Sequence, residues 1–116
     1  MPSLLLRPHP WPTAERIEIT VDAAPGTTTV VIGGQLDLVT MPFLAERLVQ
    51  VLEKGPGRLV FDLARTEFID CGSARTIAAT GRSLPPGQRP VIRRPAPGVR
   101  RVFELTGLDA DCEIDG

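Results

Sequence analysis

Apolar and polar residues alternate strictly over residues 16–22. A period of two predicts a β-strand with one buried face. Pro25 and Gly26 follow, and this pair suits the two central positions of a type II turn. A second strand is predicted over 28–32, with an extension to Leu36, so the first part of the folded chain is predicted to be a β-hairpin.

The next segment changes to a helical period. Thr40 is a suitable N-cap residue, and Pro42 lies in the first turn, where its missing N–H costs nothing. Apolar residues then recur at i, i+4, i+7 and i+8 and line one face; they are Leu44, Leu48, Val51 and Leu52. Gly55-Pro56-Gly57 ends this helix and a compact apolar run follows, which predicts a strand–helix–strand unit with a right-handed crossover and parallel strands.

The segment from Arg58 to Ile77 organises the rest of the chain. Its apolar run over 59–63 is typical of a strand buried on both faces. A polar bend is predicted over 64–67. Asp70 then ends the strand and can cap the following helix by accepting a hydrogen bond from the N–H of Ser73. Parallel sheets present their functional surfaces at such strand ends, so this corner is the predicted site.

The remaining elements are shorter. Val91-Ile92 predicts a brief strand, Pro97 opens a helix that Gly107 ends, and a last short strand over 112–114 is weakly indicated. The predicted fold is a small α/β domain with a mixed sheet of about four or five strands. Its order is β-β-α-β-α-β-α, with or without a final β, and its helices pack mainly on one face. Residues 1–14 hold four prolines and are predicted to form an arm, which leaves 15–116 as the domain.

Composition narrows the function. A chain of 116 residues with a net charge of −1 has the size of one domain and no overall field that attracts nucleic acid or membranes. The two cysteines and the single histidine do not form a metal-binding motif, and no apolar run approaches the length of a membrane span. A reduced, cytoplasmic setting is therefore expected, with no cofactor.

Three local features allow a functional and a structural interpretation. No histidine or acid pair forms a readable catalytic motif, so an enzyme is not predicted. Cys71 in a first helical turn suits a redox sensor, whereas the neighbouring Asp70 favours an unreactive thiol. Between Arg82 and Phe103 there are six arginines and no acid, and the acidic tail that follows favours a solvated face over a basic patch.

Three segments together resemble the STAS family, the sulphate-transporter and anti-sigma-factor-antagonist domain. Residues 34–42, with Gly34, Leu36-Asp37 and Pro42, are similar to its Gly-Glu-Leu-Asp-x-x-x-x-Pro segment, with glutamine at position 35 in place of the acid. Residues 68–73 are similar to its strand-to-helix corner, and residues 97–108 to its last helix. The resemblance covers about residues 15–116, and the order and spacing of the segments make it specific.

The resemblance implies a non-enzymatic regulator that binds a serine-kinase-type anti-sigma factor and so releases a sigma factor. In this family the kinase phosphorylates the serine directly after the corner aspartate, which ends the binding, since phosphate adds charge and bulk at a contact surface. That position is Cys71 here, and a thiol is not a substrate for a serine kinase. Either Ser73 is a displaced acceptor or the protein is not switched by phosphorylation, and the second interpretation is preferred.

The implied partner surface combines the loop after the second strand with the corner. Its members are Gln35, Asp37, Leu38, Thr40, Asp70, Cys71, Gly72, Ser73 and Arg75. Two alternatives remain open at this point. One is a small-molecule or redox sensor on the same scaffold, and the other is an accessory subunit of a STAS-containing assembly or transporter.

Overall fold

The computed structural model describes residues 16–116, so the predicted arm lies outside the described residues. The elements are β1 (Ile17–Ala24), β2 (Thr27–Leu36), α2 (Met41–Glu53), β3 (Arg58–Ile69), α3 (Cys71–Ala79), η2 (Thr80–Ser83), β4 (Val91–Arg93), α4 (Pro97–Leu105), η3 (Leu108–Asp111) and β5 (Glu113–Asp115). The five strands form one sheet in the order β1-β2-β3-β4-β5. The pair β1–β2 is antiparallel and the other neighbours are parallel, which confirms the predicted mixed sheet.

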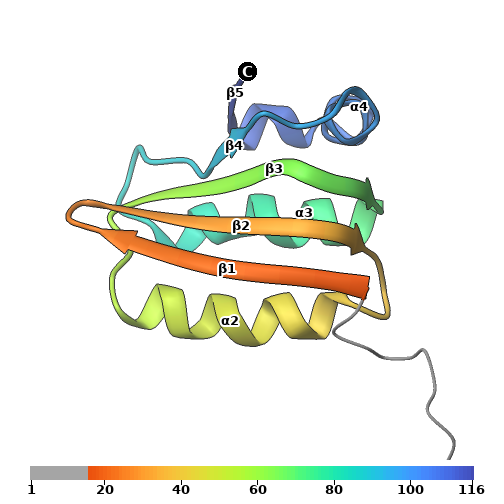
Figure 1. Cartoon of the computed structure of the whole chain (residues 1–116). Coiled ribbons are helices and arrows are strands. Elements are labelled where there is room, and N and C mark those ends of the chain that lie inside the picture. The colour runs from red at the N-terminus through yellow and green to blue at the C-terminus, as the bar shows by residue number, and fades with distance from the viewer. Residues whose placement is uncertain (1–15) are drawn as a thin grey trace, which may run out of the picture.

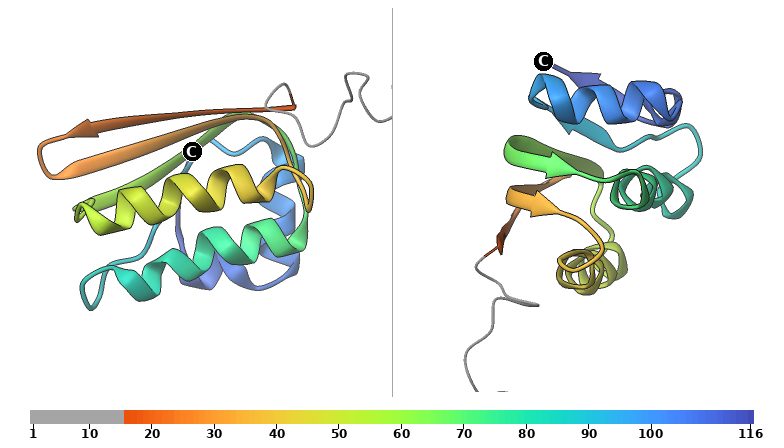
Figure 2. Two further views of the ribbon diagram at one scale, coloured as in Figure 1. Left: turned by 90° about the horizontal axis from the view of Figure 1, so that it is seen from below. Right: turned by 90° about the vertical axis from the view of Figure 1, so that its right-hand side faces the viewer.

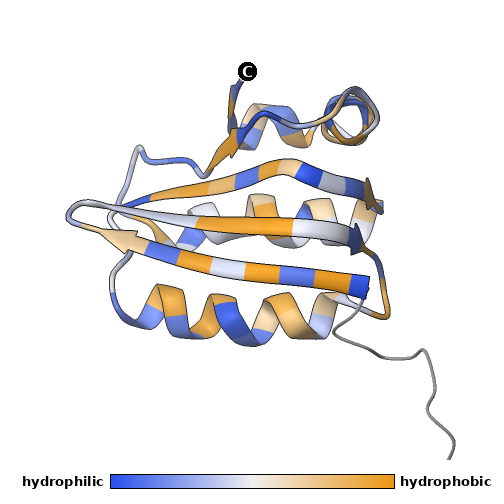
Figure 3. Cartoon of the chain, viewed as in Figure 1, coloured by the Kyte–Doolittle hydropathy of each residue, from blue (hydrophilic) through white to orange (hydrophobic). Residues whose placement is uncertain are grey.

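The helices lie on one face of the sheet (Figure 2). α2 and α3 run side by side along the strands, and α4 runs across them beside β4 (Figures 1 and 2). The core between helices and sheet is aliphatic, with Phe61 and Phe103 as its largest side chains. β1 alternates between hydrophobic and hydrophilic residues as predicted (Figure 3), and Ile17 is buried at its start.

No helix of residues 16–116 lies on the opposite face of the sheet, but part of this face is buried. Val60 and Val91 point away from the helical core and are only 0% and 1% exposed. Ion pairs between neighbouring strands and loops cross this region: Arg58–Glu113 at 3.2 Å, Arg93–Asp115 at 3.9 Å, and Arg94–Asp62. Arginine stems cover apolar surface while their charged groups stay in water, which explains how β3 is buried on both faces.

The turn and helix ends agree with the sequence at most positions. The Pro25-Gly26 turn joins β1 to β2, and Gly26 has the positive φ, 78°, that a type II turn requires. Gly107 ends α4 with φ 77°. The predicted polar bend over 64–67 is wrong, because these residues stay within β3. Two register shifts against β2, between Val31 and Gly33 and between Gly34 and Gln35, each add one residue to β3. These are β-bulges, which bend a strand without ending it.

β1 and β5 are the edge strands of the described sheet, and the β1 edge is the longer of the two. Arg47 of α2 reaches this edge and its Nη2 donates to the carbonyl oxygen of Ile19 at 3.2 Å. The residues that face away from the core on β1 include Glu18 and Asp22, so a second copy paired antiparallel about the middle of β1 would bring like charges together. Unpaired strand edges are commonly protected by charged side chains in this way.

Candidate functional site

One edge of the sheet collects the starts of the three main helices. Because β2, β3 and β4 are parallel, their carboxyl ends meet at the same edge, and α2, α3 and α4 each follow one of them. This edge is at the right of Figure 1. The two predicted site segments are the β2–α2 loop and the β3–α3 corner, and a backbone hydrogen bond from Asp70 N to Leu36 O, 3.0 Å long, joins them directly.

Asp37 organises the β2–α2 loop. Its Oδ1 accepts the backbone N–H groups of Val39 and Thr40, both at 3.0 Å, and its Oδ2 accepts Arg16 Nη2 at 3.0 Å. Burial alone raises the pKa of Asp37, but the hydrogen bonds from Thr40 and Val39 and the charge of Arg16 outweigh it, so the pKa is lowered. Asp37 is therefore a carboxylate that holds the loop closed.

Thr40 does not cap α2 with its side chain, contrary to the prediction. Its Oγ1 instead donates to Gln35 O at 2.7 Å and accepts Asp37 N at 3.0 Å. Asp37 accepts the N–H groups of Val39 and Thr40, and the threonine hydroxyl closes the loop from inside. Thr40 is 0% exposed, so it cannot contact a partner and supports the surface from below.

Asp70 caps α3 as predicted, and its Oδ1 accepts Ser73 N at 2.7 Å. Cys71 and Gly72 are exposed directly after it, and Arg75 is exposed one turn further. Ser73 is only 2% exposed, and its Oγ has no hydrogen-bond partner among the described residues. Ser73 therefore does not belong to the outer surface, in contrast to its predicted place there.

Two exposed apolar side chains lie at this edge. Leu38, at the tip of the β2–α2 loop, is 85% exposed and was among the predicted residues. Phe68 is 49% exposed, and the sequence interpretation did not include it. Its register partner on β2 is Gln35, so it lies beside the loop. The signal was present in the sequence, because a strand period of two turns Phe68 outward when Ile69 faces the core.

Arg16 was also missed. Its Nη2 binds both Asp37 and Gln35 Oε1, the latter at 3.2 Å, and so joins the start of β1 to the loop. The antiparallel register of β1 and β2, in which Ile17 pairs with Gly34, brings Arg16 opposite Gln35, although the two are 19 positions apart along the chain. The amide of Gln35 accepts from Arg16 here without adding a second negative charge beside Asp37.

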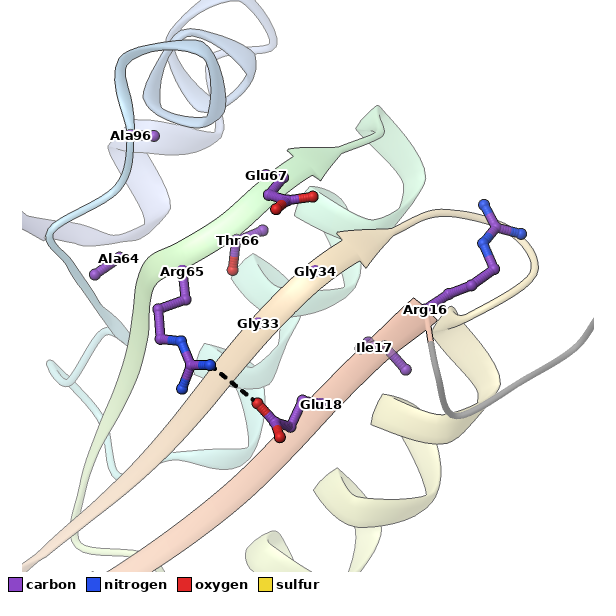
Figure 4. A pocket seen from close by; sticks show the side chains of 10 residues that line it. All are labelled: Arg16, Ile17, Glu18, Gly33, Gly34, Ala64, Arg65, Thr66, Glu67 and Ala96. Atoms are coloured by element: carbon purple, nitrogen blue, oxygen red, sulfur yellow. Dashed lines mark hydrogen bonds and ion pairs between the residues drawn. The ribbon is translucent and has the colours of Figure 1, made fainter. Parts of the chain in front are cut away.

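A hollow of about 730 Å³ lies next to this edge on the helix-free face (Figure 4). Gly33 and Gly34 line its β2 side, and an ion pair between Arg65 and Glu18, 3.2 Å long, crosses it. Gly34 has φ 96°, and a Cβ there would come within 2.4 Å of Arg16 O, so this glycine is required by the backbone. Among the charged lining residues, Arg65 and Glu18 pair with each other, and Arg16 pairs with Asp37 outside the hollow.

The chemistry of the edge is that of a contact surface. Within residues 16–116, no group of three or more potential metal ligands is present. The second cysteine, Cys112, is buried far along the chain, and burial, reinforced by Asp111, raises its pKa to about 11, which keeps the thiol neutral. Leu38 on the hydrogen-bonded β2–α2 loop and Phe68 on β3 are exposed apolar side chains of the kind that anchor protein interfaces.

The STAS domain profile matches residues 18–115, almost the whole described chain. The protein belongs to the STAS domain family. Anti-sigma-F factor antagonist RsfB of Mycobacterium tuberculosis is 34% identical over 97 residues, which cover 82% of this chain and 78% of RsfB. The putative anti-sigma factor antagonist BtrV of Bordetella bronchiseptica is 27% identical over 93 residues, covering 79% and 80% of the two chains.

Solved structures agree with this STAS assignment. An anti-sigma factor antagonist from Mycobacterium paratuberculosis superposes with a TM-score of 0.80 at 29% identity, covering 89% of this chain and 88% of the other. Unphosphorylated SpoIIAA superposes with a TM-score of 0.67 at 21% identity, over 85% and 89% of the two chains, and supports the fold. No helix in residues 16–116 of this STAS domain has the length and apolar character needed to span a membrane.

Proposed function

We propose that this STAS domain is an anti-sigma factor antagonist, a non-enzymatic module that binds a serine-kinase-type anti-sigma factor. The observation that carries the proposal is the surface that the β2–α2 loop and the β3–α3 corner form together, joined by the hydrogen bond from Asp70 N to Leu36 O. This surface exposes two apolar side chains, Leu38 and Phe68. The relatives named as antagonists supply the class of partner. A partner that controls a sigma factor acts in the cytoplasm, so the proposal places this chain there.

The contact surface would be smaller than the set expected from the sequence. Leu38, Cys71, Gly72 and Arg75 are exposed and would meet the partner, together with Phe68. Gln35, Asp37 and Asp70 are partly exposed and would shape the loop and the helix start. Thr40 and Ser73 would act only as internal supports, because both are buried.

The binding test uses the serine-kinase-type anti-sigma proteins encoded with this chain, with titration calorimetry as the measurement. Leu38→Ser should weaken binding by about tenfold or more, because buried apolar anchors dominate interface energies. The control is Leu105→Ser, which makes the same change at a 73% exposed leucine at the far end of α4. Equal affinities for the two variants, or no complex with any kinase of this class, would contradict the proposal.

The proposal includes the absence of the usual phosphorylation switch. A serine kinase transfers the γ-phosphoryl group of ATP to a hydroxyl and releases ADP, but Cys71 offers a thiol at the acceptor position. Ser73 has a hydroxyl but is 2% exposed within the first turn of α3, where a kinase cannot reach it. The complex should therefore persist when ATP is present.

The matched variant is Cys71→Ser, which restores a hydroxyl at an exposed position. After incubation with the kinase and ATP, mass spectrometry should find phosphate on residue 71 of this variant and none on the natural chain. The variant should also lose its partner when ATP is added, because the new charge lies beside Asp70. Phosphate on Ser73 of the natural chain would refute the unswitched mode while leaving the antagonist role standing.

A further inference from the structure

The arginines of residues 16–116 divide into two groups. Six form ion pairs within 4 Å: Arg16, Arg58, Arg65, Arg93, Arg94 and Arg100. Within the same residues, Arg47, Arg75, Arg82, Arg89 and Arg101 form none. Three of the six arginines in the stretch predicted to be a solvated face, Arg93, Arg94 and Arg100, are thus paired with acids, and the other three are not.

Three of the unpaired arginines line one hollow of about 280 Å³ between α3, η2 and η3. Arg75 lies in α3 and Arg82 lies in η2, which follows α3 directly, and both line the hollow. Arg89 comes from the loop before β4, and its Nη1 donates to Ala110 O at 3.1 Å, which holds the side chain against η3. Asp111 is the only acid among the lining residues. We call these three side chains and the hollow the arginine groove.

A structural role explains only part of the arginine groove. Arg82 lies in the last turn of η2, where a cation stabilises the helix end. That reason does not apply to Arg75 in the middle of α3, nor to Arg89 in a loop. Three like charges around one small hollow repel one another, so the arrangement becomes favourable when an anionic group enters it. Nucleic acid is a poor match, because the groove has no aromatic side chain for stacking and the whole chain carries a net charge of −1.

We infer that the arginine groove binds an acidic segment of the anti-sigma factor. This inference rests on the proposed function and extends its surface, because Arg75 belongs to both the corner and the groove. Guanidinium groups match carboxylates in a bidentate geometry, and Ala78 and Leu108 give the groove an apolar floor for the side-chain stems of such a segment. The partner would then lie across the β3–α3 corner and continue along α3.

The first experiment measures partner affinity at several salt concentrations. Arg82→Glu should weaken binding by about tenfold and reduce its dependence on salt, because interfacial charges act strongly on association. The matched control is Arg101→Glu, the same charge change at an exposed, unpaired arginine of α4 that does not line the groove. Arg82 makes no hydrogen bond to other described side chains, and thermal melts of both variants check that the fold is intact.

The experiments distinguish a failure of the groove inference from a failure of the proposed function. If the natural chain binds the kinase and Arg82→Glu behaves like Arg101→Glu, the groove inference is overturned and the antagonist role stands. If no kinase binds, a hexaglutamate peptide is titrated against the labelled chain by NMR. Chemical-shift changes at Ala78, Gly81 and Leu108 that Arg82→Glu removes would support an acidic-segment site, and the absence of such changes would overturn it.

Discussion

Replacing Asp37 should destabilise the protein more than replacing any other acid on its surface. In Asp37→Ala, the N–H groups of Val39 and Thr40 lose their acceptor, and Arg16 loses its ion partner. Loss of a capping side chain costs about 1 kcal/mol, and an exposed ion pair adds about 0.2–1 kcal/mol. Thr40 is fully buried, so its orphaned N–H adds a desolvation cost of about 1 kcal/mol. The expected loss in the free energy of unfolding is about 2–3 kcal/mol.

Asp37→Asn separates the two parts of this effect. The amide oxygen can still accept both N–H groups, whereas the charge that attracts Arg16 is gone, so the expected loss is about 1 kcal/mol. The assay is urea unfolding followed by circular dichroism, with Asp22→Ala as the control, because Asp22 is an exposed acid without an ion pair in the described residues. If Asp37→Ala and Asp22→Ala agree within about 0.5 kcal/mol, the loop is not held by this carboxylate.

The pH dependence gives an independent check of the same residue. The pKa of Asp37 is lowered from its ordinary value of 3.8 in the folded chain. A lowered pKa means that the carboxylate contributes its full stability above the unfolded value and loses it as the pH falls through the folded one. The stability gap between the natural chain and Asp37→Asn should therefore be constant near neutrality and shrink below about pH 4. A gap that widens on acidification would contradict the hydrogen-bond assignment.

The other predictions concern local packing and thiol access. Ser73→Ala should raise the free energy of unfolding by about 1 kcal/mol in urea titrations, because it removes a buried hydroxyl without a partner; a loss of stability would indicate an unrecognised hydrogen bond. Gly34→Ala should lower the free energy of unfolding by about 3 kcal/mol or more. Gly33→Ala, whose Cβ would meet nothing closer than 3.7 Å, should lower it by about 1 kcal/mol or less. Equal losses for the two variants would contradict the required close approach at Gly34. A thiol reagent should label Cys71 rapidly and Cys112 only on unfolding, since the Cys112 thiol is buried with a raised pKa; rapid loss of two thiols from the folded chain would refute this.

The sequence was sufficient where a short-range pattern decides the structure. Alternation defined β1, and the Asp70 cap followed from one residue type in front of a helical period. Adjacent glycines such as Gly33-Gly34 are typical of a bulge or a close backbone approach, and both occur: β3 bulges opposite this pair and Gly34 packs against Arg16. The strand over 64–67 was mistaken for a bend because of its polar residues, of which Arg65 and Glu67 are exposed while Thr66 is buried and donates to Ile32 O. Whether such residues stay in a sheet depends on the partner strand, which local sequence does not report.

The site residues also divide into those that local sequence identifies and those that depend on the folded chain. Thr40 and Ser73 were placed on the surface because their hydroxyls suit caps and phosphorylation, but both are buried in the folded chain. Arg16 was missed although the β1–β2 hairpin places it opposite Gln35, and its contact with Asp37 depends in addition on the path of the β2–α2 loop. Burial and long-range hydrogen bonds are properties of the folded chain, so these corrections needed coordinates.

The geometry of the corner separates binding from switching. The elements that shape the surface are internal: the Asp37 and Thr40 hydrogen bonds, the Asp70 cap, and the strand pairing that turns Phe68 outward. None of them needs a hydroxyl at position 71, because residue 71 contributes only its backbone to the first turn of α3. A cysteine there can therefore leave the contact surface intact while removing the phosphoacceptor. On this reasoning Cys71→Ser changes the response to ATP and not the affinity in its absence, and a large affinity change without ATP would show that the thiol itself belongs to the interface.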